Sequence, residues 1–118
     1  MTKQAVEIVL EYIEDAKQIV KFVGVLDAGR LASVEMFGLA MEYQDGLPRL
    51  NHYCCTLEAQ SDNCLEYTIC WGFYNEAEVK LNFTERPLLV GHQVIRTDYD
   101  DLQPTTTIYK VRSITPLI

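Results

Sequence analysis

The chain opens with TKQAVEIVLEYIEDAKQIVKFV, residues 2–23, in which apolar residues recur at intervals of three and four. These apolar positions are Ala5, Ile8, Val9, Tyr12, Ile13, Ala16, Ile19, Val20 and Val23. The spacing is typical of an amphipathic α-helix whose apolar stripe is covered by another element. Gly24 follows the last periodic residue, where a left-handed C-cap would stand. The sequence therefore predicts one long N-terminal helix over residues 2–23.

The rest of the chain alternates between apolar and polar residues and is interrupted by turn signals, which is typical of antiparallel strands. The clearest alternation places Val79, Leu81 and Phe83 on one face, against charged and amide residues on the other. Short loops between these segments favour a meander of neighbouring strands. The predicted strands cover residues 50–59, 65–73, 78–84, 88–97 and 105–114.

Residues 33–43 fit either a strand or a helix. As a strand, one side would carry Phe37, Leu39, Met41 and Tyr43. As a helix, the segment would cluster Leu31, Val34, Phe37 and Met41, with Gly38 as a cost. The Asp45-Gly46 turn and Pro48 that follow favour a strand that enters a hairpin.

These segments predict an α+β fold in a single domain over residues 1–118. A long amphipathic helix would pack on the concave face of a curved, mostly antiparallel sheet of five to six strands. This layout resembles that of cystatin-like and nuclear-transport-factor-like folds. The resemblance is one of layout alone, so it implies no functional residues.

The charge of the chain narrows the classes of partner. The net charge is −7 and the sequence pI is about 4.7, so a phosphate backbone or an anionic membrane surface would be repelled. We expect neither nucleic acid nor a membrane as a direct partner. The acidic residues of the first helix also rule out the uncharged core of a signal peptide, so we expect a cytoplasmic protein with reduced thiols.

The sequence indicates no metal site and no cofactor. The four cysteines, Cys54, Cys55, Cys64 and Cys70, form no CxxC pair, and His52 near Cys54 is the only His–Cys neighbourhood. The acidic run 98–101 lacks the glycine and the distal acid of a calcium loop. Phosphate loops, nucleophile elbows and HExxH motifs are also absent from the sequence.

Four residues are candidates for a ligand site. His92, on the apolar alternation of the segment 88–97, is the candidate general base. Tyr12, Tyr67, Trp71 and His92 together could line a ligand pocket, although an aromatic stripe on a strand is more often core.

Two functions therefore compete. The first is a small acidic interaction module that binds another protein or a second copy of itself, as a homodimer, through a sheet face or edge. The alternative is a small-molecule-binding protein or enzyme with a cavity between the helix and the curved sheet. The missing catalytic constellation favours the first.

Overall fold

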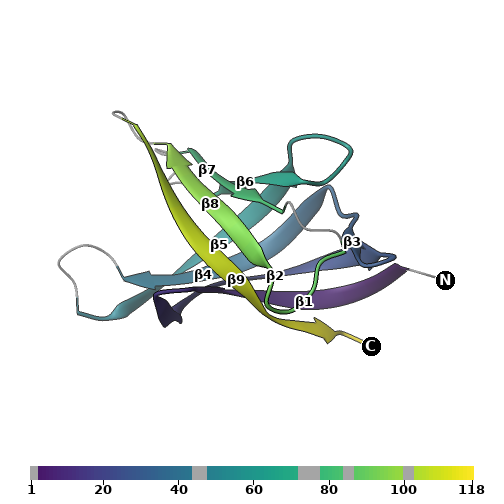
Figure 1. The fold of residues 1–118 in the computed structure, drawn as a ribbon, viewed down its shortest axis with the longest axis horizontal. Coiled ribbons are helices and arrows are strands. Elements are labelled where there is room, and N and C mark those ends of the chain that lie inside the picture. Colours follow the sequence, from purple (N-terminus) through teal and green to yellow (C-terminus); the bar gives the residue numbers. More distant parts are fainter. Residues whose placement is uncertain (1–2, 44–47, 72–77, 84–86, 100–102) are drawn as a thin grey trace.

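Nine antiparallel strands form one continuous sheet in the computed structural model, which describes residues 3–43, 48–71, 78–83, 87–99 and 103–118 (Figure 1). The strands are β1 (Lys3–Tyr12), β2 (Asp15–Asp27), β3 (Arg30–Leu31), β4 (Glu35–Tyr43), β5 (Leu50–Ala59), β6 (Glu66–Cys70), β7 (Glu78–Asn82), β8 (Gln93–Tyr99) and β9 (Pro104–Pro116). Among the described residues none is helical. The predicted α+β class is therefore wrong, and the fold is all-β.

The sheet closes on itself into a barrel. Its order is β1-β9-β8-β7-β6-β5-β4-β2-β3, and β1 also pairs with β2, so eight strands form a ring to which the short β3 is added. In such a ring, β4 and β8 are four strands apart in either direction, and so are β2 and β7. Strands of each pair therefore face one another across the interior. In Figure 1, β8 and β9 cross in front of β4 and β5.

The predicted N-terminal helix is instead the hairpin β1–β2. Along β1, Val6, Ile8 and Leu10 point inward and are buried, which is the period of two that a strand requires. The connecting turn is Ile13–Glu14, and Tyr12 pairs with Asp15 after a register shift. Ile13, placed in the centre of the buried stripe by the helical interpretation, is 47% exposed.

Two glycines that follow also have roles other than helix termination. Gly24 lies within β2, where a Cβ would come 2.4 Å from Sδ of Met36, so any larger residue there would have to displace the buried Met36 side chain. The next turn is Ala28–Gly29, in which both residues have positive φ, 53° and 82°. Positive φ at both central residues is the geometry of a type I′ hairpin, here leading into β3.

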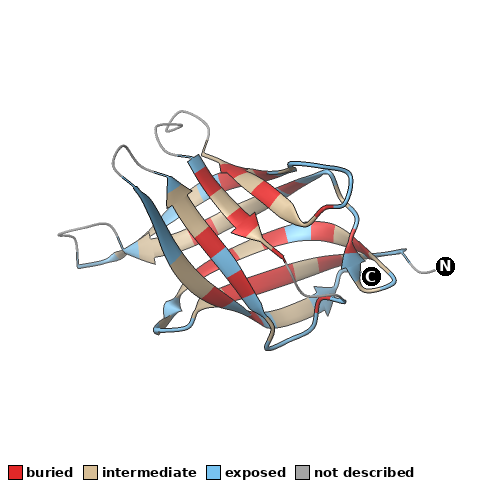
Figure 2. Ribbon diagram, turned by 45° about the horizontal axis from the view of Figure 1, so that its top comes forward, coloured by how far each residue is buried: buried red, intermediate tan, exposed pale blue. Residues whose placement is uncertain are grey.

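Of the strands predicted for the rest of the chain, residues 50–59 form β5, and the described parts of 65–73, 78–84 and 105–114 contain β6, β7 and β9. Residues 72, 73 and 84 and the predicted Asp45-Gly46 turn lie outside the described residues. The ambiguous segment forms β4, a strand as favoured, and the sheet from β4 to β9 is the expected meander. Buried residues alternate with less buried ones along several strands in Figure 2, most regularly in β6, β7 and β8. One strand begins later than predicted, because Gly91 has a φ of 93° and residues 88–92 form a loop before β8.

Aromatic contacts fill part of the barrel interior. Phe22 on β2 meets Phe83 at the end of β7, with ring centroids 5.9 Å apart, and Tyr67 on β6 meets Phe83 edge-on at 5.7 Å. Because β2 and β7 lie on opposite sides of the ring, the first contact spans the interior. Val79 and Leu81 are buried beside it, as the alternation predicted.

We expect Leu81→Ala to lower the free energy of unfolding by about 2–5 kcal/mol, because the side chain is fully buried and its removal leaves a cavity. Lys80→Ala is the control on the outer face, where its ion pairs with Glu66 and Glu78 are partly exposed, and should cost less than about 1 kcal/mol. Urea unfolding measures both. Equal midpoints for the two variants would contradict this inward and outward assignment.

Candidate functional site

Arg96 is the one buried charged residue among those the structure describes, with 7% of its surface exposed. It lies on β8 two residues after the fully buried Val94, so the strand's alternation directs its side chain into the barrel. A guanidinium at such a position must be paired, because burying an isolated charge is strongly unfavourable. Arg96 therefore marks the place where polar chemistry is concentrated inside this fold.

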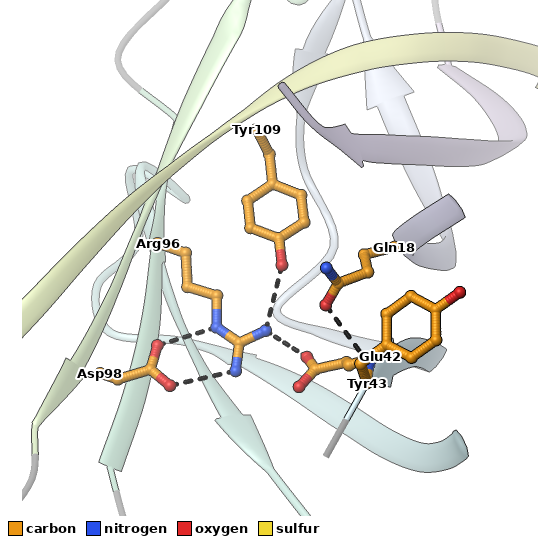
Figure 3. A network of polar contacts seen from close by, with 6 residues as sticks. All are labelled: Gln18, Glu42, Tyr43, Arg96, Asp98 and Tyr109. Carbon is orange, nitrogen blue, oxygen red and sulfur yellow. Dashed lines mark hydrogen bonds and ion pairs between the residues drawn. The ribbon is translucent and has the colours of Figure 1, made fainter. Parts of the chain in front are cut away.

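Each of the three guanidinium nitrogens of Arg96 donates at least one hydrogen bond (Figure 3). Its Nε and Nη2 donate to the two carboxylate oxygens of Asp98 at 2.8 and 3.1 Å, a bidentate arrangement. Its Nη1 donates to Oε1 of Glu42 and, at 3.4 Å, to the hydroxyl of Tyr109. One cation thus neutralises one of two carboxylates, and the cluster carries a net charge of about −1 at neutral pH.

Electrostatics keep this arginine charged. Burial opposes its charged form, but hydrogen bonds to Asp98 and the negative charge of Glu42 outweigh burial and raise the pKa of Arg96 above its usual range. The pKa of Tyr109 is also raised, mainly because its ring is buried. Neither group therefore titrates in the physiological range, so neither is suited to acid–base catalysis there.

The Arg96–Glu42 pair connects opposite walls of the barrel. Glu42 lies on β4 and Arg96 on β8, which face one another across the ring. Aromatic rings lie beside the pair. The centroid of the Trp71 ring is 5.9 Å from Cζ of Arg96, and the Trp71 and Tyr53 rings meet edge-on with their centroids 6.1 Å apart. Such a cation–π contact adds about 0.5–2 kcal/mol, according to how dry the site is.

Cys55 lies on the same inner surface, next to Tyr53 along β5. Burial raises the pKa of its thiol to about 11, with smaller contributions from Cys54 and Glu42. A thiol with so high a pKa is almost entirely protonated at neutral pH, and a protonated thiol is a poor nucleophile. Cys55 is therefore inert in the folded protein.

Two of the four predicted ligand residues border the Arg96 cluster, from opposite walls of the barrel. Tyr12 packs against Tyr109 with ring centroids 5.6 Å apart, and Trp71 contacts Arg96, so both lie at the Arg96 cluster. The hydroxyl of Tyr12 donates to Glu14 at the barrel rim.

The other two candidates lie toward the opposite end of the barrel. Tyr67 is fully buried and its hydroxyl donates to the carbonyl of Ser33 at 2.5 Å, which is the behaviour of a core tyrosine. His92 stands in the loop before β8, and its main chain is bound to Leu89 and Val111. Among the described residues, the imidazole of His92 forms no hydrogen bond to a second titratable side chain. The geometry therefore gives no support to His92 as a general base.

The recess near Tyr67 is too small for an organic ligand. Its volume is about 10 Å³, and it is lined by Leu31, Asn63, Cys64, Phe83 and Leu88 among others. That volume is about the room of a single water molecule.

Metal ligands do not gather in the part of the chain that the structure describes. Within it no group of three or more His, Cys, Asp or Glu side chains could hold a metal ion. His52 and Cys54 are both exposed on the outside of β5, and Asp98 is engaged by Arg96. Residues 100 and 101 of the acidic run lie outside the described residues. All four cysteines are free.

A second candidate site lies on the outside of the barrel. The register pairs Val23 with Phe37, Lys21 with Leu39 and Ile19 with Met41 across β2 and β4, and β5 continues these rows with Thr56, Cys54 and His52. The outward pair Glu35 and Glu58 continues β4 and β5 beyond Phe37 and Thr56. We call these eleven outward residues the β2–β4–β5 face. In one of its two middle rows, Phe37 is 67% exposed and Val23 is 42% exposed.

Sequence reasoning missed Arg96, Glu42, Asp98 and Tyr109 as a group. A signal was present, since Arg96 and Asp98 continue the inward alternation of Val94, and Glu42 continues that of Met36 and Ala40. Charged residues at inward positions on two strands predict a buried ion pair once those strands are known to face one another.

Comparison with known proteins leaves the family open. No protein-family model, curated protein or solved structure matches the chain. The described residues contain no helix long and apolar enough to span a membrane.

We expect Arg96→Met to destabilise the protein by about 1–3 kcal/mol, because it removes the cation that pairs with the partly buried carboxylates of Glu42 and Asp98. Lys80→Met is the control. Lys80 pairs on the outer wall with Glu66 and Glu78, whose side chains are 38% and 53% exposed, so both acids stay solvated and the loss should cost less than about 1 kcal/mol. Thermal unfolding compares the two variants.

The double variant Arg96→Met, Glu42→Met tests the cause. Removing both charges should recover much of the stability lost in Arg96→Met alone, since a buried pair replaced by apolar residues is often neutral. If the double variant melts at or below the Arg96→Met variant, unpaired charge is not the reason for the loss.

Adjacent cysteines on opposite faces should differ in reactivity. In dilute native protein, iodoacetamide should modify the exposed Cys54 and leave the buried Cys55 intact until the protein unfolds. Tandem mass spectrometry of the shared peptide locates the label. Equal labelling of both thiols in the native state would show that β5 does not have the described orientation.

Proposed function

We propose that this chain is a cytoplasmic protein-interaction module that binds through the β2–β4–β5 face. The observation that carries the proposal is the exposure of Phe37 beside Val23 on neighbouring strands, with Leu39 and Met41 continuing the apolar surface. Single exposed apolar residues are ordinary, but a contiguous apolar patch on a small protein marks a site of interaction. An aromatic residue at the centre of such a patch is a typical binding hot spot.

The contents of the barrel support a role for the surface over one for the interior. An eight-stranded barrel is just wide enough to be filled by side chains or to hold one small ligand. Here the Phe22–Phe83 contact spans it at one level and the Arg96–Glu42 pair spans it at another. Four of the five N–H groups of the guanidinium donate to Asp98, Glu42 and Tyr109, so most of its hydrogen-bonding capacity is used within the protein.

Closure of the sheet also favours side chains over backbone as the means of contact. Among the described residues every long strand pairs on both sides over at least part of its length, which leaves only short unpaired stretches such as residues 50–55 of β5. A partner is therefore expected to bind mainly through side chains of the wall.

A photo-reactive benzoyl-phenylalanine in place of Phe37 tests the proposal in cells that express the chain. We expect irradiation to yield a discrete covalent adduct with a protein. Ile95 is the matched control, because it is also an exposed apolar residue but lies on β8, opposite β4 across the barrel. The same substitution at Ile95 should give no such adduct. Equal adduct patterns at the two positions, or none at position 37, would overturn the proposal.

A further inference from the structure

We propose that the occupant of the β2–β4–β5 face is a second copy of this chain, bound about a two-fold axis. The inference rests on the proposed function and adds the identity of the partner. The face carries both positive and negative side chains that form no ion pair within the described residues. A second copy of the chain would pair these charges with one another.

The positive charge is Lys21, in the middle of the face. It lies opposite Leu39 on β4 and opposite Val9 on β1, so apolar residues flank it on both sides. The acids diagonal to it on β1 are Glu7 and Glu11, and Glu11 is bound to Arg112. Lys21 forms no ion pair within the described residues, whereas Lys80 on the opposite wall forms two.

The negative charges are Glu35 and Glu58, at the end of the same face. They are directly opposite one another across β4 and β5, and both are exposed. Like charges in such a cross-strand pair repel and destabilise the sheet unless a cation lies near. Neither forms an ion pair in the part of the chain that the structure describes, so the pair is a site for a cation supplied from outside.

A two-fold axis satisfies both sites at once. Consider an axis that lies in the plane of the face, runs perpendicular to the strands and passes through the Val23–Phe37 pair. Rotation about this axis places Phe37 of one copy against Phe37 of the other. The same axis brings Lys21 of each copy to the level of Glu35 of the other, one strand away. Two-fold symmetry forms this ion pair twice, which is the self-complementarity of an isologous interface. A partner without these charges would leave the Glu35–Glu58 repulsion in place.

Self-association is tested first with the unmodified chain. Analytical ultracentrifugation should show a mass of twice 13.5 kDa at high concentration. Cys54 lies on the face beside Leu39, so its rate of alkylation should fall several-fold as the protein is concentrated into the dimer. Phe37→Glu should remain monomeric with rapid alkylation of Cys54, whereas Ile95→Glu should dimerise normally. Circular dichroism confirms that both variants are folded.

Charge exchange then tests the pairing. Lys21→Glu and Glu35→Lys should each weaken the dimer about tenfold or more, because each places two like-charged contacts in a homodimer. An equimolar mixture of the two variants restores both contacts in the heterodimer and should associate about as tightly as the original chain. Failure of the mixture to associate better than either variant would overturn the pairing.

The outcomes separate this inference from the proposed function. A chain that stays monomeric at high concentration, with a constant rate of Cys54 alkylation, excludes the second copy. The proposed function would still stand if position 37 gave a cellular adduct with a different protein. If position 37 gave no protein adduct and the chain stayed monomeric, both would fall.

Discussion

The ion pair between Arg96 and Glu42 is the interaction on which the arrangement of this barrel depends. It fixes the separation of β4 and β8 at one level, as the Phe22–Phe83 contact fixes β2 and β7 at another. A buried guanidinium tolerates few surroundings, and this one is given two carboxylates, a hydroxyl and the face of an indole. The guanidinium and its carboxylates therefore satisfy one another inside the barrel, and this is why we propose that recognition takes place on the outer surface.

Much of the sheet could be predicted from the sequence, because strands that are buried on one side alternate with a period of two. The strand β7 and the order from β4 to β9 follow from that alternation and from short loops. The N-terminal hairpin could not be recognised in this way. It carries buried apolar residues on both faces of its strands: Ile8 points into the barrel, whereas Val9 and Ile19 point outward and are covered by neighbouring side chains. Together these residues also match a helical period. The turn Ile13–Glu14 carries none of the glycine or asparagine that would have marked it.

The candidate sites were predictable only in part. Aromatic character identified Tyr12 and Trp71, which contact different members of the Arg96 cluster, but it also selected the core residue Tyr67. The cluster around Arg96 forms only because β4 and β8 face one another. Which strands face one another is set when the sheet closes into a barrel, and no local sequence pattern shows it. The strand interpretation of residues 33–43 did place Phe37, Leu39 and Met41 on one side. That side proves to be the outer one, because Met36 and Ala40 fill the interior.

The pairing of β1 with β9 has a consequence for how the chain is made. Val6 lies opposite Pro116, so the ring is completed by contacts between residues about as far apart in sequence as this chain allows. During synthesis β1 and β2 can pair early, but β1 keeps an open edge until the last strand has left the ribosome. A topology with such long-range contacts folds slowly, because the chain loses the entropy of loop closure before the stabilising contacts form. The nascent chain is therefore exposed to strand-to-strand aggregation for longer than a helical protein of the same length would be.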